Sequence, residues 1–146
     1  MGLTVYLDSC IVIYIVEENS KFLPAIEQRS RTTRDLSFAV SPLTELECMV
    51  LPLRTNNRSL LDKFALWFEH TPQLALNREV FLEASKLRAD FHPLKTPDAI
   101  HIAAAQHYGV DEFWTNDDRL KSVTGTPIVK NILEAGSPPY EGGVRL

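Results

Sequence analysis

The sequence predicts an α/β fold, a three-layer α/β/α sandwich around a central parallel sheet of four to five strands. Two observations predict it. The chain contains short apolar runs with the length of buried strands, and between them lie longer segments whose apolar residues recur at helical spacing. Strands that alternate with helices pair in parallel and carry helices on both faces of the sheet. The length of 146 residues favours a single domain over residues 1–146.

The first part of the chain is expected to run strand, helix, helix, strand. Residues 4–8 are expected to form a short buried strand, followed by a helix over residues 11–19 and a second helix over residues 21–30. Residues 36–42 predict the second strand, which Pro42 ends because proline has no amide hydrogen for a strand ladder.

The middle of the chain is expected to be mainly helical. Helices are predicted over residues 43–53, 58–70 and 78–91, because apolar residues recur there along one face. Residues 73–77 are a candidate third strand. The helix over 58–70 carries more apolar surface than a one-sided helix needs, which suits a homodimer contact or a groove for a partner protein as well as a broad core face.

The last predicted helix, residues 96–109, has signals at both ends. Thr96 can cap it, Pro97 suits its first turn and Gly109 suits its end. Residues 112–117 and 126–131 are the fourth and fifth candidate strands. The tail from about residue 135 is expected to be extended or mobile.

Composition limits the possible functions. No apolar run approaches the ~20 residues of a membrane span, and the first residues show no basic segment typical of a signal peptide. Two cysteines do not make a disulfide framework, so a reduced, cytoplasmic protein is expected. The net charge of −4 argues against a broad basic surface for nucleic acid, although it leaves room for a local basic patch beside an acidic site.

Three acids lie where a functional site is expected. In parallel sheets, sites form at the carboxyl ends of the strands. Asp8 ends the first predicted strand, Asp117 follows the fourth, and Asp98 lies in the first turn of the helix after Pro97. Asp98 could simply favour the helix dipole and Asp117 could be a helix cap. Asp8 fits such an explanation less well, because apolar runs flank it on both sides.

A fourth acid comes from Glu45 or Glu47, and helical periodicity separates them. On a helical wheel with ~100° per residue, one set of apolar residues defines the expected buried arc. These residues are Leu43, Leu46, Val50 and Leu53. Glu47 falls at the margin of that arc, whereas Glu45 falls on nearly the opposite face. We therefore choose Glu47.

Several carboxylates at one sheet edge repel one another, and a divalent cation removes that repulsion. Oxygen ligands suit Mg²⁺ or Mn²⁺ rather than zinc. Such a cation meets phosphate oxygens and activates water, so the chemistry that the pattern favours is hydrolysis of a phosphodiester bond.

Four segments, "VYLDSCIVIY", "SPLTELEC", "LKTPDAIHIAAA" and "FWTNDDRL", occur in the order and spacing of PIN-domain ribonucleases. The resemblance runs from Thr4 to about Val129 and is strongest to VapC-like toxins of type II toxin–antitoxin systems. It implies an α/β/α sandwich, dependence on Mg²⁺ or Mn²⁺, RNA as substrate and inhibition by a cognate antitoxin.

Carried over position by position, the metal-binding acids of the family fall on this chain's Asp8, Glu47, Asp98 and Asp117, and its small hydroxyl residues on Ser9 and Thr115. The family commonly has asparagine where this chain has Cys10. Because a thiol cannot replace the donor and acceptor of an amide, Cys10 puts the ordering of the site in doubt.

Other polar residues near these acids have possible supporting roles. His101 lies one helical turn after Asp98 and could hydrogen-bond that acid or be a core histidine. Arg88, Lys95 and Arg119 could meet RNA phosphates, although each alone is also typical of a solvated surface charge. Cys10 and Cys48 are expected to be small buried residues rather than zinc ligands.

Two other functions remain open. The chain could be a non-catalytic PIN-like scaffold that only binds a partner. It could also be a Mg²⁺-dependent phosphoacceptor or phosphotransferase, which would need a lysine near its last strand, such as Lys130.

Overall fold

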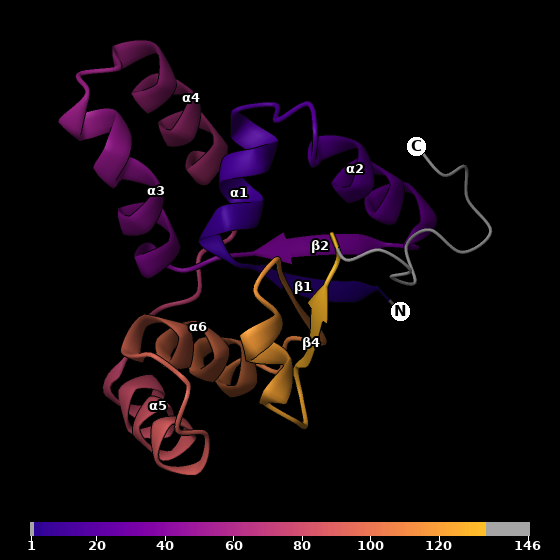
Figure 1. Ribbon diagram of the computed structural model, residues 1–146, viewed down its shortest axis with the longest axis vertical. Helices are drawn as coiled ribbons and strands as arrows, with labels where there is room; N and C mark the ends of the chain where they lie inside the picture. Colours follow the sequence, from indigo (N-terminus) through magenta and orange to yellow (C-terminus); the bar gives the residue numbers. More distant parts are fainter. Residues whose placement is uncertain (1, 134–146) are drawn as a thin grey trace.

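The computed structural model describes residues 2–133, which form an α/β/α sandwich around a sheet of four parallel strands in the order β2-β1-β3-β4 (Figure 1). The strands are β1 (Leu3–Leu7), β2 (Leu36–Ala39), β3 (Glu112–Thr115) and β4 (Ile128–Asn131). The helices are α1 (Ser9–Val16), α2 (Leu23–Thr32), α3 (Pro42–Arg54), α4 (Arg58–Glu69), α5 (Arg78–Asp90) and α6 (Thr96–His107), with a short 3₁₀ helix η1 (Asp118–Ser122). The predicted sandwich is confirmed.

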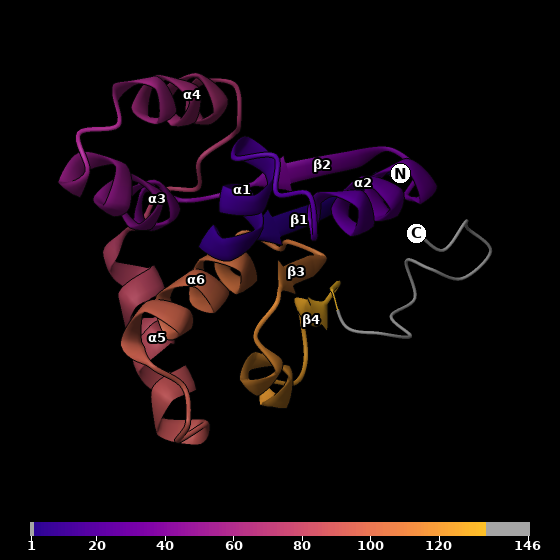
Figure 2. The ribbon, with the colours of Figure 1, turned by 45° about the horizontal axis from the view of Figure 1, so that its top comes forward.

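Strand β1 lies inside the sheet and contributes side chains to both faces. Val5 and Leu7 belong to the core cluster that contains residues of α1, α2 and α4, whereas Tyr6 belongs to the cluster of α5 and α6. Successive residues of a strand point to opposite faces, so both faces of β1 must be apolar. Figures 1 and 2 show α1 and α2 on one side of the sheet and α5 and α6 on the other.

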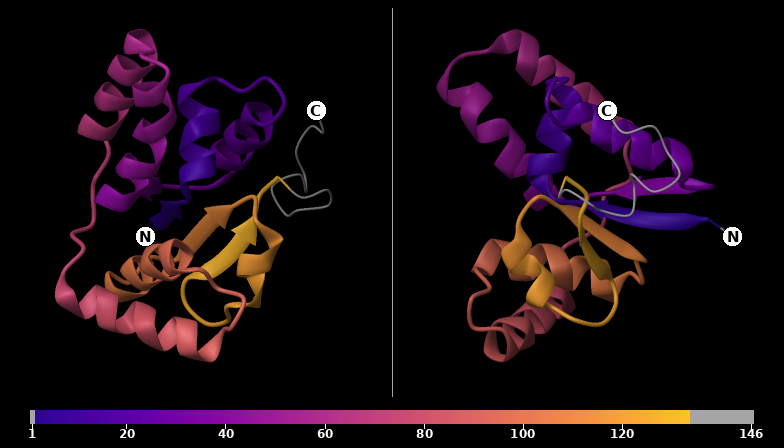
Figure 3. Two further views of the ribbon diagram at one scale, coloured as in Figure 1. Left: turned by 60° about the vertical axis from the view of Figure 1, so that its left-hand side comes forward. Right: turned by 45° about the vertical axis from the view of Figure 1, so that its right-hand side comes forward.

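Helices α3 and α4 form a hairpin beside α1 (Figure 3). The buried arc of α3 differs from the one predicted by the helical wheel. Thr44, Cys48 and Pro52 are buried, at a spacing of four residues, whereas Leu46 and Leu53 are each 60% exposed. The helical wheel is therefore wrong about the leucines, and the face of α3 with Cys48 packs against α1 instead.

The predicted strand over residues 73–77 is wrong. Only one isolated bridge pairs Gln73 with Val40, and the chain then leaves the edge of the sheet. Leu74 and Leu76 instead pack against the core cluster under α5 and α6. Their apolar side chains therefore cover a helical layer and do not extend the sheet.

The predicted ends of α6 are partly correct. The capping position belongs to Lys95, and Thr96 is the first helical residue rather than the cap. At the other end, Gly109 adopts a φ of 69°, and its amide donates to the carbonyl of Gln106 while the amide of Val110 donates to that of Ala105. This paired arrangement needs a left-handed residue, which glycine adopts without strain.

The expectation for the tail from about residue 135 lies outside the described residues. Within residues 2–133, no helix has the length and apolar character of a membrane span.

Candidate active site

Asp8 lies at the point where β1 ends and α1 begins, and it is 8% exposed. It occupies the capping position of α1, and its Oδ1 accepts a 2.8 Å hydrogen bond from the amide of Ser9. Its Oδ2 accepts a 2.7 Å hydrogen bond from the hydroxyl of Thr115, at the end of β3. Burial raises the pKa of Asp8 above its ordinary value, although nearby His101 and the Thr115 hydrogen bond oppose that shift.

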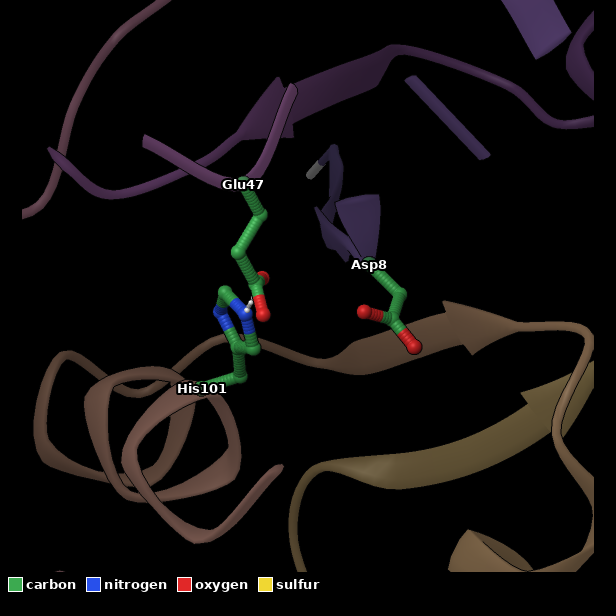
Figure 4. Close-up of side chains that lie close together, drawn as sticks. All are labelled: Asp8, Glu47 and His101. Atoms are coloured by element: carbon green, nitrogen blue, oxygen red, sulfur yellow. Dashed lines mark hydrogen bonds and ion pairs between the residues drawn. The ribbon is translucent and has the colours of Figure 1, made fainter. Parts of the chain in front are cut away.

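Glu47 and His101 meet across the gap between α3 and α6. Nε2 of His101 lies 2.6 Å from Oε1 of Glu47, and His101 is only 1% exposed. Figure 4 shows the two side chains reaching toward each other beside the carboxylate of Asp8. Glu45 points elsewhere, because its Oε1 accepts a 2.6 Å hydrogen bond from the side-chain amide of Gln73. Of the two candidates, Glu47 is therefore the one near Asp8.

Asp8, Glu47 and His101 form a possible cation site. Each offers one ligand atom, and these atoms all lie within 4.8 Å of one another. A single divalent cation has ligands 2.0–2.6 Å away, so atoms at this separation can share one. The oxygen donors of two carboxylates suit the Mg²⁺ or Mn²⁺ that the sequence predicts.

Asp98 belongs to the same electrostatic group, although it is not one of the three clustered residues. It lies in the first turn of α6 and is half-buried. Burial raises the pKa of Asp98, and the charges of Asp8 and Asp117 raise it further. This mutual repulsion among carboxylates is the situation that a bound cation relieves.

Asp117 has a partner of its own in this structure. It caps η1, accepting a 3.0 Å hydrogen bond from the amide of Arg119, and the guanidinium of Arg119 also pairs with its carboxylate. These hydrogen bonds lower the pKa of Asp117, with a smaller contribution from the charge of Lys95. The capping explanation therefore applies to Asp117, which nevertheless lies close enough to Asp98 to raise its pKa.

Arg88 is used within the fold. Its Nε donates to the carbonyl of Leu94 at 3.1 Å and its Nη1 donates to the hydroxyl of Thr96 at 2.9 Å. These bonds tie α5 to the start of α6, the helix that carries Asp98 and His101. Lys95 is exposed at the same helix start.

Sequence reasoning assigned no role to Tyr6. Its hydroxyl lies 2.6 Å from Nδ1 of His101 and 3.2 Å from the hydroxyl of Thr44, and it donates a 2.8 Å hydrogen bond to Ser41. A signal was available, because residues two apart in a strand point to the same face and Tyr6 precedes Asp8 by two. Because most neighbouring residues of the strand are apolar, the sequence pattern alone predicts a core residue at Tyr6.

The two cysteines are free thiols, of which Cys48 is buried and Cys10 is partly exposed. Burial raises the pKa of the Cys10 thiol to about 12 and also raises that of Cys48. Lys130, the lysine that a phosphoacceptor would need, donates a 2.8 Å hydrogen bond to Glu112.

The fold is similar to solved toxin–antitoxin structures. In a toxin–antitoxin complex from Klebsiella pneumoniae, the matching chain is 20% identical with a TM-score of 0.67, and the match covers 88% of this chain and 97% of that one. The matching chain of VapBC2 from Rickettsia felis, bound to a promoter DNA fragment, is 12% identical with a TM-score of 0.69, and the match covers 88% of this chain and 98% of that one. The matching chain of VapBC-5 from Mycobacterium tuberculosis is 16% identical with a TM-score of 0.59, and the match covers 87% of this chain and 95% of that one.

No curated protein sequence matches the chain. A family model, that of the PIN domain, matches residues 5–125, which is most of the chain and includes Asp8, Glu47, Asp98, His101 and Asp117. With the sandwich fold and the cluster of acids at the strand ends, this match establishes that the chain belongs to the PIN-domain family.

Proposed function

We propose that this chain is a metal-dependent endoribonuclease that acts as the toxin of a toxin–antitoxin pair, with residues 1–146 as one nuclease domain. The observation that carries the proposal is the convergence of Asp8, Glu47 and His101 at the carboxyl ends of the strands, beside Asp98, in a PIN-domain chain. A resident Mg²⁺ or Mn²⁺ would supply a Lewis acid for the phosphate and a nucleophilic water at neutral pH.

The residues divide this work between binding and orientation. Asp8, Glu47, Asp98 and Asp117 are the proposed metal ligands. The backbone amide of Ser9 and the hydroxyl of Thr115 each donate to a different oxygen of Asp8, which fixes the plane of its carboxylate. Fixed ligands need little reorganisation when charge develops on the scissile phosphate.

Substrate contact is proposed for the cations beside these acids. The guanidinium of Arg119 pairs with Asp117, and the charge of Lys95 also lowers the pKa of that carboxyl. Arg119 can release Asp117 to a cation and then present its planar guanidinium to a phosphate. Arg88 contributes at the start of α6, where its exposed side chain donates to Thr96.

The partner proposal rests on the comparisons and on exposed apolar surface. The similar structures are toxin–antitoxin complexes by name. A groove between α1 and α4, lined in part by Ile15, Val16, Leu66 and Trp67, offers apolar surface for an inhibitory polypeptide. A homodimer and a cytoplasmic location remain predictions from the sequence, and light scattering of the purified chain tests the first.

Cleavage of a mixed RNA pool tests the enzymatic proposal. The purified chain is incubated with Mn²⁺, with Mg²⁺ or with EDTA, and DNA of the same sequences is a parallel substrate. We expect cleavage of RNA with either metal and none with EDTA. Cleavage that persists in EDTA would exclude a metal-dependent site.

A matched pair of variants on α3 locates the activity. Glu47→Gln is expected to reduce cleavage at least a hundredfold, because it removes a proposed metal ligand. Glu45→Gln makes the same chemical change two residues away, where the carboxylate contacts Gln73, and is expected to leave cleavage unchanged. Equal activity in the two variants would contradict the assigned site.

Growth of a bacterial host separates a toxin from a scaffold. Expression of the unaltered chain and of Glu45→Gln is expected to arrest growth, whereas Glu47→Gln is not. A non-catalytic scaffold would give the same growth in all three cultures. Phosphorylation of Asp8 by a small phosphodonor, without RNA cleavage, would instead favour the phosphoacceptor.

A further inference from the structure

The buried hydroxyl of Tyr6 and the ring of His101 form a chain of hydrogen bonds that ends on Glu47. Tyr6 on β1 lies 2.6 Å from Nδ1 of His101, and Nε2 of the same ring lies 2.6 Å from Glu47 (Figure 4 shows the second contact). Tyr6 is completely buried and His101 nearly so. These two hydrogen bonds therefore connect β1, α6 and α3 inside the protein.

Both ring nitrogens of His101 take part in these hydrogen bonds. An imidazole binds a cation through the lone pair of one nitrogen, so a nitrogen that is already hydrogen-bonded must first lose its partner. His101 lies close enough to Asp8 and Glu47 to share a cation with them. Its hydrogen bonds, rather than its distance, therefore decide whether it becomes a ligand.

Resting on the proposed function, we infer that Tyr6 is a positioning residue: its contact with Nδ1 fixes the ring of His101 so that Nε2 stays on Glu47, and while Nε2 is held by Glu47 it does not bind the metal. Glu47 is thereby fixed by a neighbour that does not compete for the cation. The metal then meets carboxylate oxygens only, a donor set that favours Mn²⁺ and Mg²⁺ over Zn²⁺.

Neighbouring residues hold Tyr6 itself in place. Its hydroxyl donates to Ser41 at 2.8 Å and lies 3.2 Å from the hydroxyl of Thr44, at the start of α3. Its ring stacks on Phe113 of β3, with 5.3 Å between ring centroids and 8° between ring planes. A side chain fixed at both its ring and its hydroxyl can impose an orientation on His101.

Electron paramagnetic resonance of bound Mn²⁺ tests this inference directly. A nitrogen that coordinates Mn²⁺ gives a characteristic ¹⁴N modulation in electron spin echo spectra, whereas carboxylate oxygens do not. We expect no coordinated ¹⁴N in the unaltered protein. In Tyr6→Phe the ring is released, and we expect a coordinated ¹⁴N signal that is absent from the double variant Tyr6→Phe/His101→Gln.

Metal affinity gives a second measurement that does not depend on RNA cleavage. In Tyr6→Phe the released ring no longer supports Glu47, so we expect Mn²⁺ to bind about tenfold more weakly, the usual effect when a ligand loses its outer partner, and the preference for Zn²⁺ over Mn²⁺ to rise. Tyr108→Phe is the matched control. It removes a phenol hydroxyl that donates only to the carbonyl of Ala75, and it is expected to change neither value.

The outcomes separate this inference from the proposed function. Absence of Mn²⁺ binding in the unaltered protein would overturn the metal site itself. Binding accompanied by coordinated ¹⁴N in the unaltered protein would overturn the inference alone, because His101 would then be a ligand. Unchanged spectra and affinities in Tyr6→Phe would overturn the role of Tyr6.

A second pair of variants keeps the test decisive if Tyr6→Phe does not fold. His101→Gln retains an amide donor for Glu47, whereas His101→Leu has none. We expect His101→Gln to bind Mn²⁺ with nearly the affinity of the unaltered protein and His101→Leu to bind about tenfold more weakly. Equal weakening in both variants would contradict a donor role for His101.

Discussion

The hydroxyl of Thr115 donates to Oδ2 of Asp8 at 2.7 Å, and through this bond the end of β3 fixes the carboxylate at the end of β1. Thr115 is fully buried, and its oxygen also accepts the amide of Asp117 at 3.1 Å. One hydroxyl therefore orders two of the proposed metal ligands.

Thr115→Val tests this role with little change in shape. Loss of the hydroxyl leaves an oxygen of Asp8 and the amide of Asp117 without this partner, and we expect about 1–3 kcal/mol of destabilisation. Mn²⁺ affinity is expected to fall about 10- to 100-fold. Isothermal titration calorimetry measures the affinity. Thr71→Val, whose hydroxyl donates to the carbonyl of Trp67 in α4, is the control and should bind Mn²⁺ normally.

Asp98→Asn is expected to stabilise the metal-free protein. Burial and the charges of Asp8 and Asp117 disfavour the ionised carboxylate, and an amide removes that repulsion. Because Asp98 is only half-buried, water screens the effect, and we expect a gain of about 0.5 kcal/mol in the free energy of unfolding. Urea unfolding in EDTA measures it. A loss of stability would mean that the carboxylate has a structural function.

The stability of the metal-free protein is expected to depend on pH with a defined sign. The folded-state pKa values of Asp8 and Asp98 are raised, so between their ordinary and raised values the folded protein binds more protons than the unfolded chain. The free energy of unfolding therefore rises as the pH falls into that range. Asp117, whose pKa is lowered, acts in the opposite direction at lower pH, where its protonation removes stability.

Urea unfolding at several pH values in EDTA checks this dependence. We expect the gain on acidification to be smaller in Asp98→Asn than in the unaltered protein. Identical profiles would show that Asp98 has an ordinary pKa in the folded state.

Arg119→Gln is expected to tighten metal binding. Arg119 pairs with Asp117 and competes with a cation for that carboxylate. Because the pair is exposed, its contribution is small, and we expect Mn²⁺ affinity to rise about two- to fivefold. Arg31→Gln removes the same charge from α2, where the guanidinium contacts Gln28, and is the control for net charge. Weaker binding in Arg119→Gln would show that the arginine orders Asp117 for the metal.

The sequence predicts the layers and most helices of this protein because their apolar periodicity is strong. It also distinguishes Glu47 from Glu45, although for a partly incorrect reason. The wheel placed Leu46 and Leu53 inside, but α3 buries Thr44 and Cys48 instead, and Glu47 adjoins that face. Periodicity identified the correct side of the helix only approximately, because it depends on large apolar residues, and on α3 two of these are exposed.

Sequence patterns do not predict the contacts between distant segments of this chain. Nothing local to "QLALN" shows that Leu74 and Leu76 cover a helical core rather than extend a strand. Likewise, the role of Tyr6 depends on His101, which reaches it only after β1 and α6 pack together. Spacing along the chain can suggest such residues, but only the packed fold shows which atoms meet.

The bond between Thr115 and Asp8 also has a consequence for how the protein is made. It spans 107 positions, and β1 pairs with β3 across a similar stretch of chain. Pairings between segments so far apart form late in folding, because closing a long loop loses entropy before contacts compensate. A nascent chain that has emerged only as far as α5 lacks His101 and Thr115 alike. A site that contains all of these residues can therefore form only after Thr115 has been synthesised.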